Sequence, residues 1–351
     1  MRHWIAEDTK GEVVLKELVK RLGVRFNIKR HFESIQADLD KVEQRILDQI
    51  DLFDSSIRDY VEYTMQSQGK RIRPALCLLA AQASGKVTDA HYHLAVIVEM
   101  IHLASLVHDD IMDNALIRRA RPTAYAKWGP ELAVLLGDCL FVQALKLCDH
   151  FEDSSIGRTL ADTTHEVCTG EILQTQRRFD INLRTDEYYR MIEMKTGALF
   201  RVSTELAGHL SKVPDAWTNA LRTYGRKLGS AYQIYDDCLD LFALEETTGK
   251  TVGTDLAKGK LTLPILHVLE QLSGEEHESF TEMILSKDPA MHEKICVKVI
   301  EQGGHLMAVQ RTQEILEQAE KSLYVLQQTP ARTLLEALPQ ALHTYMEQLK
   351  T

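Results

Sequence analysis

The chain contains, at residues 94–113, the stretch LAVIVEMIHLASLVHDDIMD, a long apolar run that ends in acidic residues. Leu94, Ile97, Val98 and Ile101 recur at intervals of three and four, the period of one buried helix face. Its most apolar part, residues 94–107, is interrupted by Glu99 and His102 and is too short to span a bilayer. We therefore expect a core helix in a protein without membrane-spanning segments.

The rest of the chain repeats this helical pattern. Apolar residues three and four apart also follow one another at 35–50, whereas alternating runs bounded by hairpin turns, which indicate β-strands, are missing. The sequence predicts an all-α protein, a single large helical bundle of roughly ten or more helices. No linker rich in Pro, Gly or Ser divides it, so we expect an N-terminal arm of unknown role at 1–28 and one domain at 29–351.

Composition narrows the classes of function. A net charge of −10 disfavours nucleic acid as a partner, because phosphate binding rewards clustered Lys and Arg. The N-terminus lacks the apolar core of a signal peptide, and the six cysteines show no CxxC or zinc-like spacing. We expect a cytoplasmic protein with reduced thiols. An acidic protein can still bind phosphate if divalent metal ions, held by its carboxylates, meet the phosphate.

Two acidic motifs share the same spacing. They are Asp109-Asp110-Ile111-Met112-Asp113 and Asp236-Asp237-Cys238-Leu239-Asp240. The outer aspartates of each motif are one helical turn apart and share a face, and hard oxygen ligands in this arrangement suit Mg²⁺. One such motif could be a solvated helix end, but two copies after apolar stretches favour metal binding. Packed face to face, the two helices would hold a diphosphate through bridging Mg²⁺.

Basic residues that could hold phosphate occur in several short motifs. Arg grips phosphate through two hydrogen bonds, and Lys acts as a point charge. Each residue alone could be an ordinary surface charge, but together with two acidic motifs they favour a phosphate site. They are Lys70, Arg71 and Arg73 before a helix, Arg118 and Arg119 after the first acidic motif, and Lys195, Lys250 and Lys260.

In combination these motifs resemble the trans-prenyl diphosphate synthase family, whose members elongate isoprenoid chains. The resemblance extends over about residues 30–345, in the family's own order. It implies the isoprenoid synthase fold with a central active-site cavity. It also implies condensation of isopentenyl diphosphate with an allylic diphosphate to an all-trans polyprenyl diphosphate. The matching motifs are Gly69 through Pro74, Glu99 through Asp113, Arg118 through Thr123, Gly137-Asp138, Gly170-Glu171, Lys195-Thr196-Gly197, Gln233 through Asp240, Gly249 through Asp255 and Gly259 through Pro264.

The resemblance also implies a role for each site residue. Mg²⁺, about three ions per site, would be bound by Asp109, Asp113 and Asp236, with Asp110, Asp237 and Asp240 as further ligands or as supports of the ligands. Isopentenyl diphosphate would be held by Lys70, Arg73, His102 and Arg119. The allylic diphosphate would be held by Arg118, Lys195, Thr196, Gln233 and Lys250, and Lys260 would also contact substrate. The catalytic residues would be Asp109, Asp113, Asp236, Arg118, Lys195 and Lys250.

The implied chemistry needs no base from the protein. Departure of the allylic diphosphate would leave a cation that the isopentenyl double bond attacks, and the departed diphosphate would take the proton then lost. His102 lies two turns before Asp109 and shares its face, which favours a role at the site over that of an ordinary core histidine. The family further implies a homodimer, and it leaves open delivery of the product to a membrane.

Other functions stay open. A non-catalytic partner subunit would reshape the product tunnel of an active synthase, although such subunits typically lose acidic or basic motifs that this chain keeps. A His-Asp type metal phosphohydrolase, to which His108-Asp109 would belong, requires further histidine ligands at one centre. A terpene cyclase shares the fold, but it would not need the second diphosphate site that Lys70, Arg73 and Arg119 indicate.

Product length should depend on the helix face below Asp109. One helical turn rises about 5.4 Å, roughly one isoprene unit, so a growing chain would pass successive turns of this helix. These turns present the small Ala104 and Ser105, then Ile101, then Val98, and none carries an aromatic ring. In the family, small residues at the first of these turns accompany geranylgeranyl and longer products. We expect a product of at least about twenty carbons, with thirty or more favoured.

Overall fold

The computed structural model describes residues 26–66, 69, 71–119, 121–242, 253–288 and 290–349, with the backbone alone for 26–34. Almost all of these residues form helices joined by short turns, and one antiparallel pair of two-residue strands interrupts them. The predicted all-α class is therefore confirmed. None of the described helices is both long enough and apolar enough to cross a bilayer. Residues 1–25 of the predicted arm lie outside the described residues.

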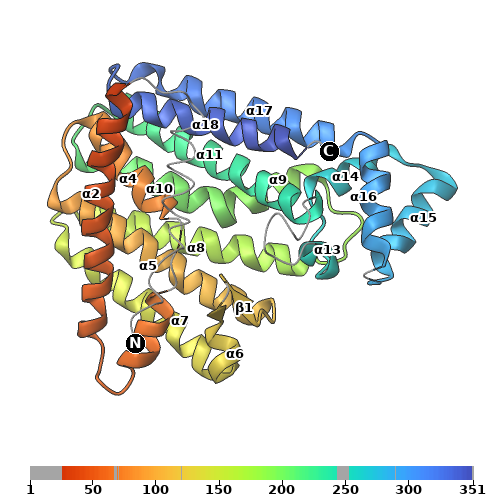
Figure 1. Cartoon of the computed structure of the whole chain (residues 1–351), viewed down its shortest axis with the longest axis horizontal. Coiled ribbons are helices and arrows are strands. Elements are labelled where there is room, and N and C mark those ends of the chain that lie inside the picture. Colours follow the sequence, from red (N-terminus) through yellow and green to blue (C-terminus); the bar gives the residue numbers. More distant parts are fainter. Residues whose placement is uncertain are drawn as a thin grey trace, which may run out of the picture. The chain divides into compact units, whose positions relative to one another are not determined.

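The chain divides into two compact units, of which the first comprises Met1–Gly157, Leu210–Lys212 and Gln328–Leu334. Its central helix is the predicted core helix, α5 (Asp89–Met112), whose apolar residues from Leu94 to Ile101 are buried. This helix packs against α2 (Phe26–Asp48), α4 (Ile72–Ser84) and α7 (Pro130–Lys146), as Figure 1 shows. The other elements are η1 (Gln49–Leu52), α3 (Arg58–Met65), β1 (Ile117–Arg118), β2 (Arg121–Pro122), α6 (Ala124–Trp128) and η2 (Leu147–His150).

Local sequence accounts for the start of α7 and for its close contact with α5. Pro130 occupies the first turn of α7 directly after Gly129, whose φ of 85° is a conformation that favours glycine. Further along, a Cβ on Gly137 would lie 2.2 Å from Nε2 of His108, so a larger residue there would force the His108 ring to move. The His108 ring, next to the acidic motif, is therefore packed against α7.

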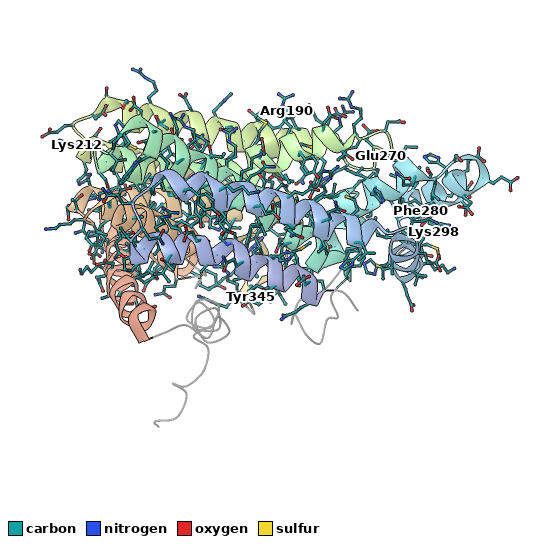
Figure 2. The ribbon with its side chains drawn as sticks, turned by 90° about the horizontal axis from the view of Figure 1, so that it is seen from above. Arg190, Lys212, Glu270, Phe280, Lys298 and Tyr345 are labelled. Carbon is teal, nitrogen blue, oxygen red and sulfur yellow. The ribbon has the colours of Figure 1, made fainter. Side chains whose placement is uncertain are left out.

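The second unit comprises Arg158–His209, Val213–Gln327 and Leu335–Thr351. Its longest helix, α11 (Asp215–Phe242), packs against α17 (Gly304–Ser322) and a π-helical turn, η3 (Glu193–Gly197). Tyr345, labelled in Figure 2, lies on α18 (Pro330–Gln348), and its ring centroid is 6.3 Å from that of Tyr235 on α11. The other elements lying wholly or mostly in this unit are α8 (Ser154–Gln176), α9 (Thr185–Ile192), α10 (Ala198–Leu210), α13 (Thr254–Ala257), α14 (Leu263–Gln271), α15 (Gly274–Leu285), α16 (Met291–Glu301) and η4 (Leu323–Val325).

Two glycines allow α11 to lie directly against α10. A Cβ on Gly225 would lie 2.3 Å from Oγ1 of Thr204, and a Cβ on Gly229 would lie 2.9 Å from the side chain of Phe200. Larger residues at either position would push the helices apart, because a close-packed interior has no room for them. The two glycines therefore set how closely α11 approaches α10.

Candidate active site

The three aspartates at the acidic end of α5 differ in how far they are buried. Asp109 and Asp113 are partly exposed and one turn apart, and the Asp113 N–H donates to the Asp109 carbonyl at 2.8 Å. Asp110 is buried, and its Oδ1 accepts a hydrogen bond from Nε of Arg118 at 2.7 Å. Asp109 and Asp113 are therefore the solvent-facing ligand candidates of this helix, and Asp110 holds Arg118.

Positive charge converges on His102, two turns earlier on the same helix. Burial lowers the pKa of His102 well below its ordinary value, and the charges of Arg73, Arg119, Arg118 and Arg71 lower it further. The imidazole is therefore neutral near pH 7 and can donate a hydrogen bond without adding charge. The structure thus brings together the predicted residues Arg73, His102 and Arg119. Lys70 lies outside the described residues.

Arg71, whose charge also acts on His102, is held by two carboxylates. It has the left-handed φ of 48°, and its guanidinium donates to Glu99 at 2.7 Å and to Glu43 at 2.7 and 2.9 Å. Burial alone would lower the pKa of Arg71, but the hydrogen bonds and charges of the two glutamates raise it. Arg119 lies nearby, since a Cβ on Gly69 would sit 3.0 Å from Nη1 of Arg119 and 3.4 Å from Oε1 of Glu99.

The acidic end of α11 also separates exposed from buried carboxylates. Asp236 is exposed, whereas Asp237 is buried and accepts hydrogen bonds from the Tyr188 hydroxyl at 2.6 Å and from Nε2 of Gln233 at 2.8 Å. Burial, followed by the negative charge of Asp255, raises the pKa of Asp237 to about 8. Asp236 is therefore the ligand candidate here, and Asp237 anchors α9 and α11 to each other.

Two of the residues predicted to bind diphosphate hydrogen-bond to each other in this unit. Thr196 donates its hydroxyl to Oε1 of Gln233 at 2.6 Å, which continues the chain of hydrogen bonds from Asp237. Lys195 is held by α8, with Nζ 2.5 Å from Oε2 of Glu171 and 3.0 Å from Oε1 of Gln174. The π-helical turn therefore presents Lys195 and Thr196 from one short segment.

The third aspartate of α11 caps a short helix. The Asp240 carboxylate accepts hydrogen bonds from the Thr254 N–H at 3.3 Å, the Thr254 hydroxyl at 2.9 Å and the Asp255 N–H at 2.9 Å. These are the first residues of α13, whose backbone N–H groups need acceptors. Nζ of Lys260 lies 3.4 Å from Oδ1 of Asp255, which places Lys260 near the same end of α11. Lys250 lies outside the described residues.

The predicted chain-length residues differ in exposure. Ala104, Ile101 and Val98 are buried, and only Ser105 is partly exposed. The Ser105 hydroxyl donates to the His102 carbonyl at 2.8 Å, which leaves its Cβ as the group that a substitution would extend. Ser105 is therefore the one predicted chain-length residue whose side chain is accessible on this face.

Each acidic motif by itself has donors that suit a metal ion bound together with phosphate. Within the described ranges, no group of three or more His, Cys, Asp or Glu side chains is arranged to hold a metal ion unaided. Mg²⁺ usually binds one or two carboxylates together with phosphate oxygens and water, so Asp109 with Asp113, or Asp236, fits that requirement. Nε2 of His108 lies 3.2 Å from the Val134 carbonyl oxygen and 3.4 Å from Oδ1 of Asp138. Because this ring nitrogen already faces protein oxygens, the geometry does not favour a histidine-based metal centre.

Sequence reasoning assigned no individual role to several residues that organise this site. Glu43 and Tyr188 hold Arg71 and Asp237 from other helices, and no local pattern marks either of them. Glu99 was detectable, because a carboxylate within the apolar stretch 94–107 needs a cationic partner. Asp255 could be recognised only as part of a longer motif. Its effect on the pKa of Asp237 could not be predicted from the sequence.

Known proteins are similar to this chain in sequence. Residues 54–302 match the family model described as Polyprenyl synthetase. An all-trans-nonaprenyl-diphosphate synthase (geranyl-diphosphate specific) of Rhodobacter capsulatus is 34% identical over 79% of this chain and 84% of that protein.

Two solved structures extend the similarity to the fold. A decaprenyl diphosphate synthase from Rhodobacter capsulatus is 30% identical, with a TM-score of 0.84 over 92% of this chain and 100% of that one. A polyprenyl synthase from Caulobacter crescentus, complexed with calcium and isoprenyl diphosphate, is 31% identical, with a TM-score of 0.83 over 90% of this chain and 97% of that one.

Proposed function

Since the chain belongs to the polyprenyl synthetase family of prenyltransferases, we propose that it condenses isopentenyl diphosphate with an allylic diphosphate in a Mg²⁺-dependent reaction. One observation carries the proposal. Each acidic helix end combines exposed aspartates with groups that suit a diphosphate. At α5 these are Arg73, Arg119 and the neutral His102, and near α11 they are Lys195 and Thr196.

Asp109, Asp113 and Asp236 would hold the Mg²⁺ ions. When bound, Mg²⁺ supplies positive charge that stabilises the departing diphosphate as a Lewis acid. The calcium and isoprenyl diphosphate in the Caulobacter structure support a divalent metal and a prenyl substrate for this chain as well. Asp110, Asp237 and Asp240 would position neighbouring groups, because their carboxylates already accept hydrogen bonds from the protein.

Isopentenyl diphosphate would be bound by the cluster around His102. Arg73 and Arg119 would contact the phosphate oxygens, and His102 would donate a hydrogen bond. On the allylic side, Arg118, Lys195, Thr196 and Gln233 would orient the leaving diphosphate. The allylic carbon–oxygen bond breaks, the isopentenyl double bond forms the new carbon–carbon bond, and the departed diphosphate takes the proton that leaves.

The product would have at least about twenty carbons, and the names of the nonaprenyl and decaprenyl synthases support a longer one. Ser105→Phe tests the path, because it places a ring on the partly exposed position of the first turn below Asp109. Shorter products with an unchanged Mg²⁺ requirement would support the proposal. Ala104→Tyr is a harsher test, because Ala104 is fully buried and a large ring there would strain the core.

A homodimer would cover an apolar face of α7. One side of this helix packs on α5, while on the other Leu135 and Val142 are 59% and 56% exposed, next to the exposed Val134 and Leu145. An apolar stripe of this kind usually marks a protein contact. Sedimentation should therefore detect a species of twice the 39.9 kDa chain mass, and a monomer at micromolar concentration would contradict the dimer.

The decisive experiment uses the pure chain alone. It is incubated with Mg²⁺, isopentenyl diphosphate and each short allylic primer in turn, and the products are sized. Formation of a polyprenyl diphosphate supports the proposed function. Turnover that requires a second, different chain would favour the non-catalytic subunit, and release of inorganic phosphate from a nucleotide would favour a phosphohydrolase.

All six cysteines are free thiols, which supports a cytoplasmic location for the enzyme.

A further inference from the structure

The turn that carries Arg118 and Arg119 has an unfavourable backbone. β1 and β2 pair Ile117 with Pro122 and Arg118 with Arg121, so Arg119 lies in the tight turn between two-residue strands. Its φ of 52° is left-handed, a conformation that non-glycine residues rarely adopt. A short ribbon with such a turn is not stable by itself, so surrounding contacts must hold it.

One strand of this ribbon is fixed by α5 and by its own flanking residues. The Nε–H group of Arg118 donates a hydrogen bond to Oδ1 of Asp110 at 2.7 Å. The hydroxyl of Thr123 donates to the Ala115 carbonyl at 2.6 Å, and the Thr123 N–H donates to the Leu116 carbonyl at 3.0 Å. These bonds close the base of the ribbon on the side of the acidic motif.

The other strand, β2, contacts α3, mainly through the aromatic residue Tyr63. The Tyr63 hydroxyl donates to the Pro122 carbonyl at 2.9 Å, and the Arg121 guanidinium lies 4.5 Å from the centre of the Tyr63 ring. Arg121 also reaches the Gln66 carbonyl at the end of α3, at 3.4 Å. Tyr63 thus contacts both residues of β2, one through its hydroxyl and the other through its ring.

The Tyr63 ring is held in turn by α6, the helix that follows the ribbon. Nζ of Lys127 lies 3.8 Å from the ring centre, and the Trp128 ring meets Tyr63 edge to face at 5.0 Å. Trp128 contacts Tyr60 of α3 in the same way at 5.0 Å. Cation–π and edge-to-face contacts of this kind fix ring orientation as well as position.

We propose that Tyr63 is a positioning residue that holds the arginine turn in its strained conformation. It thereby keeps the Arg119 guanidinium beside Gly69 and Glu99, close enough to influence His102. The proposal rests on the proposed function, in which Arg119 binds isopentenyl diphosphate. Loss of Tyr63 should therefore weaken isopentenyl diphosphate binding more than it slows chemistry.

The test compares three variants of the full chain. Tyr63→Leu should raise KM for isopentenyl diphosphate about tenfold, with kcat and KM for the allylic primer changed less than about threefold. Tyr63→Phe keeps the ring and loses one hydrogen bond, so it should raise the same KM only about threefold. Tyr60→Leu is the matched control, because it removes the other Trp128 contact of α3 and should leave both KM values unchanged.

A second measurement keeps the two proposals separable. Amide hydrogen exchange of the segment 115–123 should be faster in Tyr63→Leu than in wild type and unchanged in Tyr60→Leu. If the wild-type chain shows no prenyl transfer, the proposed function fails, and the exchange rates still decide the role of Tyr63. Equal exchange in Tyr63→Leu and wild type, or an equal rise of both KM values, would overturn the positioning role.

Discussion

The acidic ends of α5 and α11 have the same sequence spacing but opposite electrostatic surroundings. Near the end of α5, burial and the charges of Arg73 and other arginines lower the pKa of His102. At the end of α11, burial and the charge of Asp255 raise the pKa of Asp237 to about 8. The first end can attract phosphate through its own cations, whereas at the second end burial and the charge of Asp255 favour the neutral form of the Asp237 carboxyl group.

The last aspartates of the two motifs differ as well. Asp113 follows the last residue of α5 and is partly exposed. Asp240 lies inside α11, and its carboxylate accepts hydrogen bonds from Thr254 and Asp255 at the start of α13. Equal positions in a sequence motif therefore do not imply equal roles, because the helix continues in one case and ends in the other.

The largest expected effect concerns the exposed aspartates that both ends share. Asp109→Ala and Asp236→Ala should each reduce turnover about a thousandfold or more, because ionisation depends on charge held at these positions. Circular dichroism should show the fold unchanged. Near-normal turnover of either variant at saturating Mg²⁺ would contradict the idea that both ends act in one reaction.

A smaller effect should separate the two substrates. Arg119→Lys replaces a bidentate contact by a point charge and should raise KM for isopentenyl diphosphate about tenfold, with less effect on the allylic diphosphate. Steady-state kinetics with each substrate varied in turn provides the measurement. An equal rise for both substrates would remove the assignment of this arginine to the isopentenyl side.

The third prediction compares the last aspartates directly. Asp240→Asn should lower the free energy of unfolding by about 1 kcal/mol, because an amide cannot accept hydrogen bonds at both of its ends. It should leave the Mg²⁺ concentration for half-maximal rate unchanged. Asp113→Asn should leave the free energy of unfolding unchanged and raise the Mg²⁺ concentration for half-maximal rate. Calorimetric unfolding together with Mg²⁺ titration distinguishes the two variants. A shift in Mg²⁺ requirement for Asp240→Asn would make Asp240 a metal ligand.

The smallest effect is a pH dependence near the end of α5. The folded-state pKa of His102 lies below its unfolded value, so the unfolded chain binds the proton first and stability falls as pH drops. Between pH 7 and 6, His102 should contribute a loss of about 0.7 kcal/mol, which His102→Gln should remove. Urea unfolding at both pH values measures the difference. Equal losses in wild type and variant would show that His102 is not kept neutral by folding.

Much of the site could be predicted because helical geometry is local. Asp109 and Asp113 share a face whatever surrounds them, and the apolar period of 94–107 indicates a buried helix. The partners could not be predicted in the same way. Tyr188 is 49 residues from Asp237, and only the packing of α9 on α11 brings its hydroxyl within 2.6 Å.

The sequence by itself determined the helical class, the spacing of both acidic motifs and the set of cations available to them, since all three follow from residue identity and the helical repeat. The tertiary structure alone decided which carboxylates stay exposed. The chain turns back after α5, so that Arg118 donates a hydrogen bond to the buried Asp110. The Asp240 carboxylate already accepts hydrogen bonds from the protein, because α13 begins next to it. Burial and pairing depend on segments distant in sequence, so no local pattern could have specified them.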